Sequence, residues 1–190
     1  AKDAGVTYEE MTWACAGINH LAWFTTLEHD GKSLYPTLNA KVKDRTGDVY
    51  ESDPIRYDMM MHFGAFITES SGHLSEYLPY YRRNPELLKK YCRPQYRGES
   101  RYYATNWPNW RKRHDATRMK QLNGEESIEW NRSWEYASWI IEAREKDSPF
   151  RIHGNVMNHA PGNRGAGQLI TNLPADGCVE VACMIDRNGI

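Results

Sequence analysis

The stretch Cys15-Ala-Gly-Ile-Asn-His-Leu-Ala-Trp-Phe24 decides the fold, because it places two polar side chains inside an otherwise apolar run. From residue 13 to residue 26 the chain is apolar, β-branched and aromatic, which predicts a buried strand. Gly17 interrupts this strand, and a glycine within a strand often marks the close approach of a ligand or of another backbone. Asn19 and His20 follow where only hydrocarbon is expected.

The Asn19–His20 pair has two interpretations. Buried polar groups need partners, because leaving one unpaired costs about 1–3 kcal/mol. A lone histidine in a core usually bonds a backbone carbonyl, which is the purely structural interpretation. A neutral imidazole is also the commonest metal ligand in proteins, so the alternative is that His20 binds a metal or a substrate.

A second polar segment, Thr68-Glu-Ser-Ser-Gly-His73, follows a helical pattern over residues 54–64. It brings one acid, two hydroxyls and one imidazole close together after the threonine, and small polar loops at helix ends commonly carry chemistry. The structural alternative is that Ser70 or Ser71 only caps a helix over residues 74–83. The two roles are compatible.

The order of the remaining patterns predicts an α+β fold with an antiparallel or mixed sheet. A strand hairpin comes first, several helices follow, and strands return at the end of the chain. The expected elements are a hairpin turn at 28–31, an exposed loop over 41–57, a basic solvated helix over 111–122, a helix capped by Ser133, and a meander of three strands at 150–157, 168–173 and 178–185.

Composition excludes several classes of protein. The 190 residues suit one domain with a sizeable core. Lysine plus arginine number 24 and aspartate plus glutamate 25, so the chain lacks the excess of basic residues that is typical of proteins that bind nucleic acid or an anionic membrane. No apolar run approaches the ~18 residues of a membrane span. Four cysteines without C-x-x-C spacing and a start without an apolar signal region favour a cytoplasmic protein.

The opening stretch resembles the metal-site segment of glycoside hydrolase family 4, the NAD- and manganese-dependent glycosidases. Three further stretches agree with it: Phe66-Ile-Thr-Glu-Ser-Ser-Gly-His-Leu-Ser-Glu-Tyr77, Asn172-Leu-Pro174 and Val179-Glu-Val-Ala-Cys-Met-Ile-Asp-Arg-Asn-Gly189. Together they resemble the α-galactosidase (melibiase) branch most. The resemblance implies that residues 1–190 form one substrate- and metal-binding domain, like the C-terminal domain of these lactate/malate dehydrogenase-like enzymes, cut at both ends and without their N-terminal NAD-binding domain.

The resemblance also implies a mechanism that departs from the two-carboxylate scheme of most glycosidases. In this family NAD takes a hydride from the sugar C3, a base removes the C2 proton, the glycosidic oxygen leaves, water adds and the ketone is reduced again. The metal polarises the C3 oxygen, and a site of nitrogen and oxygen ligands with open positions suits Mn²⁺. The expected cofactors are therefore NAD and Mn²⁺, although no G-x-G-x-x-G fingerprint follows a strand in this chain.

Residue by residue, the resemblance assigns His20 as a metal ligand and Asn19 as a contact to a substrate hydroxyl. Cys15 is expected to pack in the core, because a strand rises about 3.3 Å per residue and Cys15 could not converge on one ion with His20 without a bend. Arg164 and Asn172 are candidate sugar contacts, with a structural role in turns as the alternative for each.

The base that removes the C2 proton is assigned to His73, at a position where related branches hold a tyrosine or an aspartate. Imidazole is competent as a general base near neutral pH. Tyr77 and Glu69 remain alternatives for the same role.

The function implied is part of an α-galactosidase that acts on α-galactosides and is inactive as this chain alone. The alternatives are another family specificity, α-glucosidase or α-galacturonidase, or a sugar-binding or assembly domain without chemistry. The expected partners are an α-galactoside or related sugar and, in the full-length enzyme, further copies of the same chain, with neither nucleic acid nor a membrane.

Overall fold

The computed structural model describes residues 1–92, 102–133, 135–159 and 167–190. The described strands are β1 (Thr12–Ile18), β2 (Leu21–His29), β3 (Lys32–Ser33), β4 (Phe66–Ile67), β5 (Phe150–Met157) and β6 (Cys178–Ile185). They form one sheet in the order β3-β2-β1-β6-β5, with β4 paired to β2, and each of these pairs is antiparallel. The expected α+β fold with an antiparallel sheet is confirmed.

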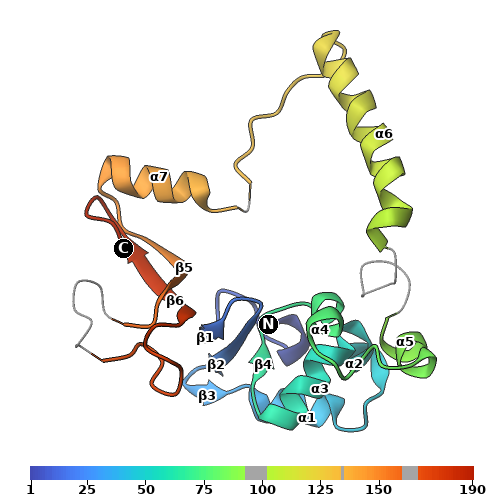
Figure 1. Ribbon diagram of the computed structural model, residues 1–190, viewed down its shortest axis with the longest axis vertical. Helices are drawn as coiled ribbons and strands as arrows, with labels where there is room; N and C mark the ends of the chain where they lie inside the picture. Colours follow the sequence, from blue (N-terminus) through green and yellow to red (C-terminus); the bar gives the residue numbers. More distant parts are fainter. Residues whose placement is uncertain (93–101, 134, 160–166) are drawn as a thin grey trace.

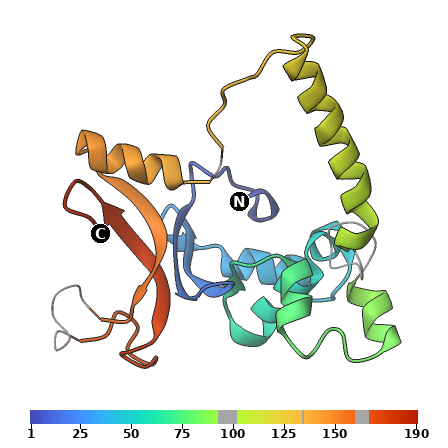
Figure 2. The same cartoon turned by 45° about the horizontal axis from the view of Figure 1, so that its top comes forward.

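The helices divide between two parts of the sheet (Figure 1). They are the 3₁₀ helix η1 (Lys2–Ala4) and the α-helices α1 (Tyr35–Val42), α2 (Gly47–Ser52), α3 (Pro54–Phe63), α4 (Ser71–Tyr77), α5 (Pro85–Tyr91), α6 (Tyr102–Leu122) and α7 (Ala137–Lys146). Helices α1 to α4 gather beside β1–β4, and α7 lies on β5 and β6, whereas α6 projects away from the sheet (Figures 1 and 2). None of the helices in the described ranges is long and apolar enough to cross a membrane.

The single strand predicted over residues 13–26 is in fact a hairpin of β1 and β2. The pair runs in register from Ile18 opposite Leu21, so Asn19 and His20 form its two-residue turn instead of lying inside a strand. His20 has φ +64°, a left-handed conformation that histidine, asparagine and aspartate tolerate better than most residues. The expected close approach at Gly17 is confirmed, because a Cβ atom there would lie 2.6 Å from the Cα of Ala22.

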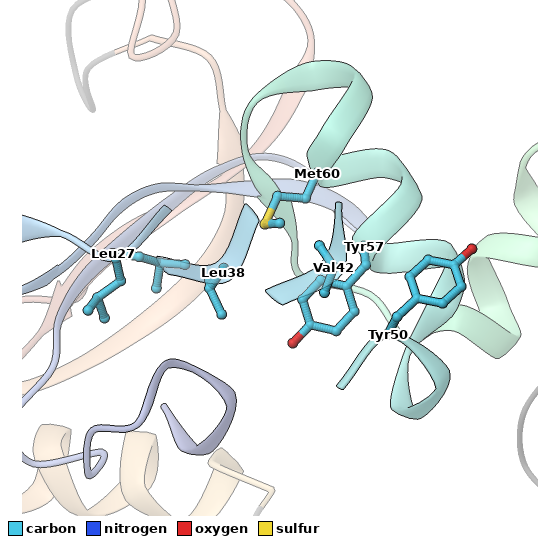
Figure 3. Close-up of a cluster of buried hydrophobic side chains, with 7 residues drawn as sticks. Leu27, Leu38, Val42, Tyr50, Tyr57 and Met60 are labelled. Atoms are coloured by element: carbon cyan, nitrogen blue, oxygen red, sulfur yellow. The ribbon is translucent and has the colours of Figure 1, made fainter. Parts of the chain in front are cut away.

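A cluster of buried apolar side chains joins β2 to α1, α2 and α3 (Figure 3). The exposed loop predicted over residues 41–57 was wrong, because this region contains α2 and contributes Tyr50, only 2% exposed, to the cluster. The Tyr50 hydroxyl donates a 3.1 Å hydrogen bond to buried Asp58, which also accepts from Arg45 Nε at 3.0 Å and Tyr91 at 2.8 Å. These long-range partners bury a segment whose own sequence is polar.

The helix boundaries follow the sequence signals at some ends and depart from them at others. The pattern over 54–64 is confirmed as α3, which stops at Gly64 with φ +79°. Helix α4 spans Ser71–Tyr77 rather than 74–83, and Ser70 caps it as expected. Helix α7 begins at Ala137, so the prediction that Ser133 caps it was wrong. Arg132 instead bonds Glu142 at 2.6 Å, which keeps residues 131–133 beside α7 rather than in its first turn.

Strands β5 and β6 match the predicted ranges, but residues 168–173 form turns and not a strand. The side chain of Asn158, fully buried, explains the difference. Its Nδ2 donates to the carbonyls of Ile170, Leu173 and Pro174 at 2.9–3.0 Å, and its Oδ1 accepts from the Ile170 N–H at 2.8 Å. One buried amide thus satisfies backbone groups that a neighbouring strand would otherwise have paired.

We expect Asn158→Ala to lower the free energy of unfolding by about 2–4 kcal/mol, because several buried backbone groups lose their partner. Urea denaturation followed by circular dichroism measures this. Asn155→Ala, a substitution at an exposed position of β5 three residues earlier, should stay within about 0.5 kcal/mol of the wild type and serves as the control. Equal effects of the two substitutions would contradict the role assigned to Asn158.

Candidate metal centre

Two imidazoles and one carboxylate converge beside the β1–β2 turn. One ligand atom each from His20, Glu69 and His73 lies within 4.8 Å of the other two. The Nδ1 of His20 hydrogen-bonds the Oε2 of Glu69, and the Nδ1 of His73 lies 3.5 Å from the same oxygen. Residues 49 positions apart in the chain therefore meet at one carboxylate.

The hairpin turn presents His20 to this cluster. A two-residue turn leaves little freedom for the chain, and the left-handed backbone of His20 is held by the β1–β2 pairs on either side. The turn side chains are exposed, so the imidazole is about half open to solvent.

The other two members come from the junction of β4 and α4. β4 pairs with β2 at Trp23 and Phe24, and the N–H of Thr68 donates a 2.9 Å hydrogen bond to the carbonyl of Ala22. Glu69 follows at once, and its Oε1 accepts from the Ser70 N–H at 2.7 Å. His73 lies in the first turn of α4, where its N–H donates to the hydroxyl of the capping Ser70 at 3.4 Å.

The start of α4 is also fixed to the start of α3. The buried hydroxyl of Ser71 donates to the carboxylate of Asp53 and accepts from the N–H groups of Ile55 and Arg56 at 3.1 and 3.2 Å. Arg56 in turn donates to the carbonyl of Ile67 from Nε and Nη2 at 3.0 and 2.9 Å. The backbone around Glu69 is thereby held from both sides.

The electrostatics favour an ionised carboxylate at the centre of the cluster. Partial burial alone raises the pKa of Glu69, but the hydrogen bonds from His20 and Ser70 and the nearby His73 outweigh it, so its pKa lies below the ordinary value. The Nδ1 of His73 is buried without a hydrogen-bond partner among the described residues. A buried polar atom without a partner is costly, and a ligand bound there would relieve that cost.

Tyr77 closes the cluster on one side. Its ring centre lies 5.3 Å from that of His20 and 6.0 Å from that of His73. Because Tyr77 follows His73 by four residues in α4, the two side chains lie on one face of the helix. All four residues that the sequence analysis assigned to metal or base roles are therefore neighbours.

Glu180 is an acidic neighbour that the sequence analysis did not single out. It lies on β6 directly opposite Gly17 of β1, in the register that joins the two parts of the sheet. Partial burial raises the pKa of Glu180; the charge of His20 opposes this shift and that of Glu69 adds to it. The signal available in the sequence was an acid among the apolar residues of a predicted strand, the same signal that drew attention to His20.

The remaining candidates lie outside the cluster. Cys15 is partly buried on β1 and is not a member of the buried apolar clusters of the described residues, and burial raises the pKa of its thiol. Asn19 occupies the turn beside His20. Asn172 lies in an exposed turn before β6 and makes no hydrogen bond to the cluster within the described part of the chain. Arg164 lies outside the described residues.

The donor set fits a divalent first-row metal. Two imidazole nitrogens and one carboxylate oxygen lie close enough together for two or all three of them to bind one ion, which would leave other positions open for substrate oxygens. The Glu69 carboxyl, whose pKa is lowered, supplies the negative charge that a cation requires, and the Nδ1 of His73 lies 3.5 Å from it without a hydrogen bond to any described residue.

Comparison with known proteins identifies relatives along the whole chain. Residues 15–190 match the family 4 glycosyl hydrolase C-terminal domain. The chain is 38% identical to an α-galactosidase of Bacillus subtilis, over 100% of this chain and 41% of the relative. It is 33% identical to an α-galactosidase of Rhizobium meliloti, over 100% of this chain and 38% of the relative. The chain therefore spans about two fifths of the length of these curated glycosidases.

A solved structure shares the fold. The 6-phospho-α-glucosidase from gut microorganisms, solved in complex with NAD and Mn²⁺, superposes with a TM-score of 0.59 at 20% identity, over 99% of this chain and 42% of that chain. At this level of identity the likeness concerns the fold.

We expect His20→Ala to abolish Mn²⁺ binding with little loss of folded structure, because the imidazole lies in an exposed turn. Since alanine is strained at φ +64°, His20→Asn provides a variant that tolerates the turn and still removes the imidazole. Isothermal titration with Mn²⁺ measures the affinity, with His29→Asn on β2 as the matched control. Wild-type Mn²⁺ affinity in both His20 variants would show that His20 is not a ligand.

Proposed function

Because the chain belongs to family 4 of the glycosyl hydrolases, we propose that it forms the substrate- and metal-binding domain of an α-galactosidase. The observation that carries the proposal is the convergence of His20, Glu69 and His73 beside Tyr77, at the positions that resemble the family's site. Two α-galactosidases among its relatives, matched over the whole chain, favour galactose as the sugar.

In this proposal His20 and Glu69 hold the metal ion. Mn²⁺ is the candidate, because it accompanies NAD in the 6-phospho-α-glucosidase of the same fold. When bound, the ion supplies Lewis-acid polarisation of a sugar oxygen. Glu69 is held by hydrogen bonds to both of its carboxylate oxygens. It is therefore better suited to be a metal ligand in a fixed position than to be a base that moves toward the substrate.

His73 is the residue we assign to take the proton from C2 of the sugar. Its side chain is 44% exposed although its Nδ1 is buried, so the outward edge of the ring is open to a substrate. The Glu69 carboxylate beside it stabilises the imidazolium that forms when the proton arrives. Tyr77 is the alternative base, because its exposed ring lies on the same face of α4.

Asn19 is placed to contact a sugar hydroxyl, because it shares the exposed hairpin turn with His20. A bound NAD would supply a hydride acceptor for C3 of the sugar, and the resulting ketone would make the C2 proton acidic. Because the chain spans only about two fifths of the length of its curated relatives, we assign NAD to the remainder of the whole enzyme.

The test of the function is hydrolysis of p-nitrophenyl α-galactoside by the whole enzyme, with and without NAD⁺ and Mn²⁺ under reducing conditions. We expect turnover only when both are present. Turnover indifferent to NAD⁺ would contradict the proposed chemistry. NAD-dependent turnover of an α-glucoside or α-galacturonide, but not of the galactoside, would retain the chemistry and correct the sugar. No turnover of any of these would favour a non-catalytic sugar-binding domain.

We expect His73→Ala to slow C2–deuterium exchange of the substrate by about a hundredfold or more, the usual contribution of a general base. Mn²⁺ affinity should stay near the wild-type value. NMR of substrate recovered from D₂O measures the exchange, and His62→Ala on the exposed end of α3 is the control. Unchanged exchange would transfer the role to Tyr77, whereas a loss of Mn²⁺ affinity would make His73 a third metal ligand.

A further inference from the structure

Glu180 is a carboxylate near the candidate metal centre to which the proposed reaction gives no role. It is partly buried on β6. Burial raises its pKa, the charges of His20 and Glu69 act on it in opposite directions, and no hydrogen bond from a described residue contributes. Withdrawing a carboxylate from water without a hydrogen-bond partner is costly. A ligand that donates a hydrogen bond would therefore find a strong acceptor at Glu180.

The side chain of Glu180 faces the side of the sheet away from α7. Its neighbours along β6 are Val179, only 1% exposed, and Val181, which packs against the apolar cluster that α7 shares with β5 and β6. Successive side chains of a strand point to opposite faces of the sheet, so Glu180 points away from that cluster. The charges of His20 and Glu69 act on the Glu180 carboxyl, which places the candidate metal centre near it.

Gly17 leaves the space beside Glu180 open. The two residues are directly opposite each other in the pairing of β1 with β6. Side chains in such a pair stand on the same face of the sheet, about 4.5–5.5 Å apart at Cβ. A side chain at Gly17 is excluded, because its Cβ would lie 2.6 Å from the Cα of Ala22. No side chain of β1 therefore covers Glu180 at this position.

The strand order places Glu180 and His73 on opposite sides of His20. Strand β2 lies between β4 and β1, and β1 lies between β2 and β6 (Figure 1). His73 comes from α4, which follows β4, and Glu180 comes from β6, whereas His20 lies in the turn between β1 and β2. Gly17 precedes His20 by three residues, so the position opposite Glu180 lies no more than about 10 Å along the chain from that turn.

Three consecutive carbons of the sugar ring follow the same order. In the proposed function His73 takes the proton from C2 and the oxidised carbon is C3, so the C3 oxygen belongs at His20 and Glu69. The next carbon in that direction is C4, on the side of Glu180, whereas C1 and the leaving group lie in the opposite direction. Galactose and glucose differ only in the configuration of the hydroxyl at C4. A protein group that contacts this hydroxyl therefore distinguishes the two sugars.

We propose that Glu180 accepts a hydrogen bond from the C4 hydroxyl of the sugar and thereby selects an α-galactoside over an α-glucoside. The axial hydroxyl of galactose donates to the carboxylate, whereas the equatorial hydroxyl of glucose points away and leaves the carboxylate unpaired. A site built to pair with a substrate hydroxyl strongly rejects analogues that cannot make that bond. The inference rests on the proposed function, because the assignment of His73 to C2 sets the orientation of the ring.

Titration calorimetry of the whole enzyme with Mn²⁺ and NADH, which cannot accept a hydride, measures sugar binding without turnover. The ligands are methyl α-galactoside, its 4-deoxy and 6-deoxy analogues, and methyl α-glucoside. In the wild type, the 4-deoxy analogue and the glucoside should bind about tenfold to a hundredfold more weakly than the galactoside, the range for losing a hydrogen bond to a charged group. In Glu180→Ala the galactoside should weaken by a similar factor, and the penalty for lacking the 4-hydroxyl should disappear. Glu180→Gln, whose amide oxygen still accepts, should retain part of the penalty.

Asn155→Ala is the matched control, because Asn155 is exposed on β5 directly opposite Glu180. It should keep the wild-type penalty for the 4-deoxy analogue, and the ratio of galactoside to 6-deoxy affinity should be the same in every variant. Far-UV circular dichroism verifies that each variant is folded.

An undiminished 4-deoxy penalty in Glu180→Ala would overturn the proposal. So would a wild type that binds the galactoside and its 4-deoxy analogue equally, or a Glu180→Ala variant that removes a penalty from the 6-deoxy analogue instead. A wild type that binds none of these glycosides would contradict the function proposed above, on which this contact depends.

Discussion

The short pairing of β4 with β2 is the contact on which the candidate metal centre depends. Only two residue pairs define it, yet it places the residue after Thr68 beside the turn that follows β1. Glu69 and His20 are separated in the chain by 48 residues, which include the whole of α1, α2 and α3. This pairing brings the two residues together in space. A backbone contact of small extent therefore converts two distant segments into one site.

The surrounding hydrogen bonds make that placement rigid rather than approximate. Ser71 satisfies the free N–H groups at the start of α3 while beginning α4, so neither helix can shift without exposing unpaired backbone groups. Arg56 holds the carbonyl of Ile67 in the same way. Metal and proton-transfer chemistry tolerates little error in position, and such support by neighbouring residues is what fixes it.

The sequence identified the candidate site residues better than it predicted the local geometry that brings them together. His20, Glu69, His73 and Tyr77 were all found from residues that resemble a known family, and the structure brings the four together. The turn at Asn19–His20 was missed because it contains no glycine or proline, and only cross-strand register distinguishes it from a continuous strand.

Local sequence patterns also failed to predict burial and strand pairing that depend on residues farther along the chain. The polar region around Tyr50 is buried because the Asp58 carboxylate, eight residues later, accepts a hydrogen bond from the Tyr50 hydroxyl. Residues 168–173 were predicted as a strand, but the buried side chain of Asn158 takes the hydrogen bonds that a strand partner would require. In each case the deciding group lies outside the window that a pattern covers.

The left-handed backbone at His20 restricts which residues could ever replace it. Among side chains that bind metals, histidine, asparagine and aspartate adopt positive φ with little penalty, whereas cysteine and glutamate lack the short polar group that eases it. The backbone conformation of this one turn residue therefore tolerates replacement by asparagine or aspartate more readily than replacement by cysteine.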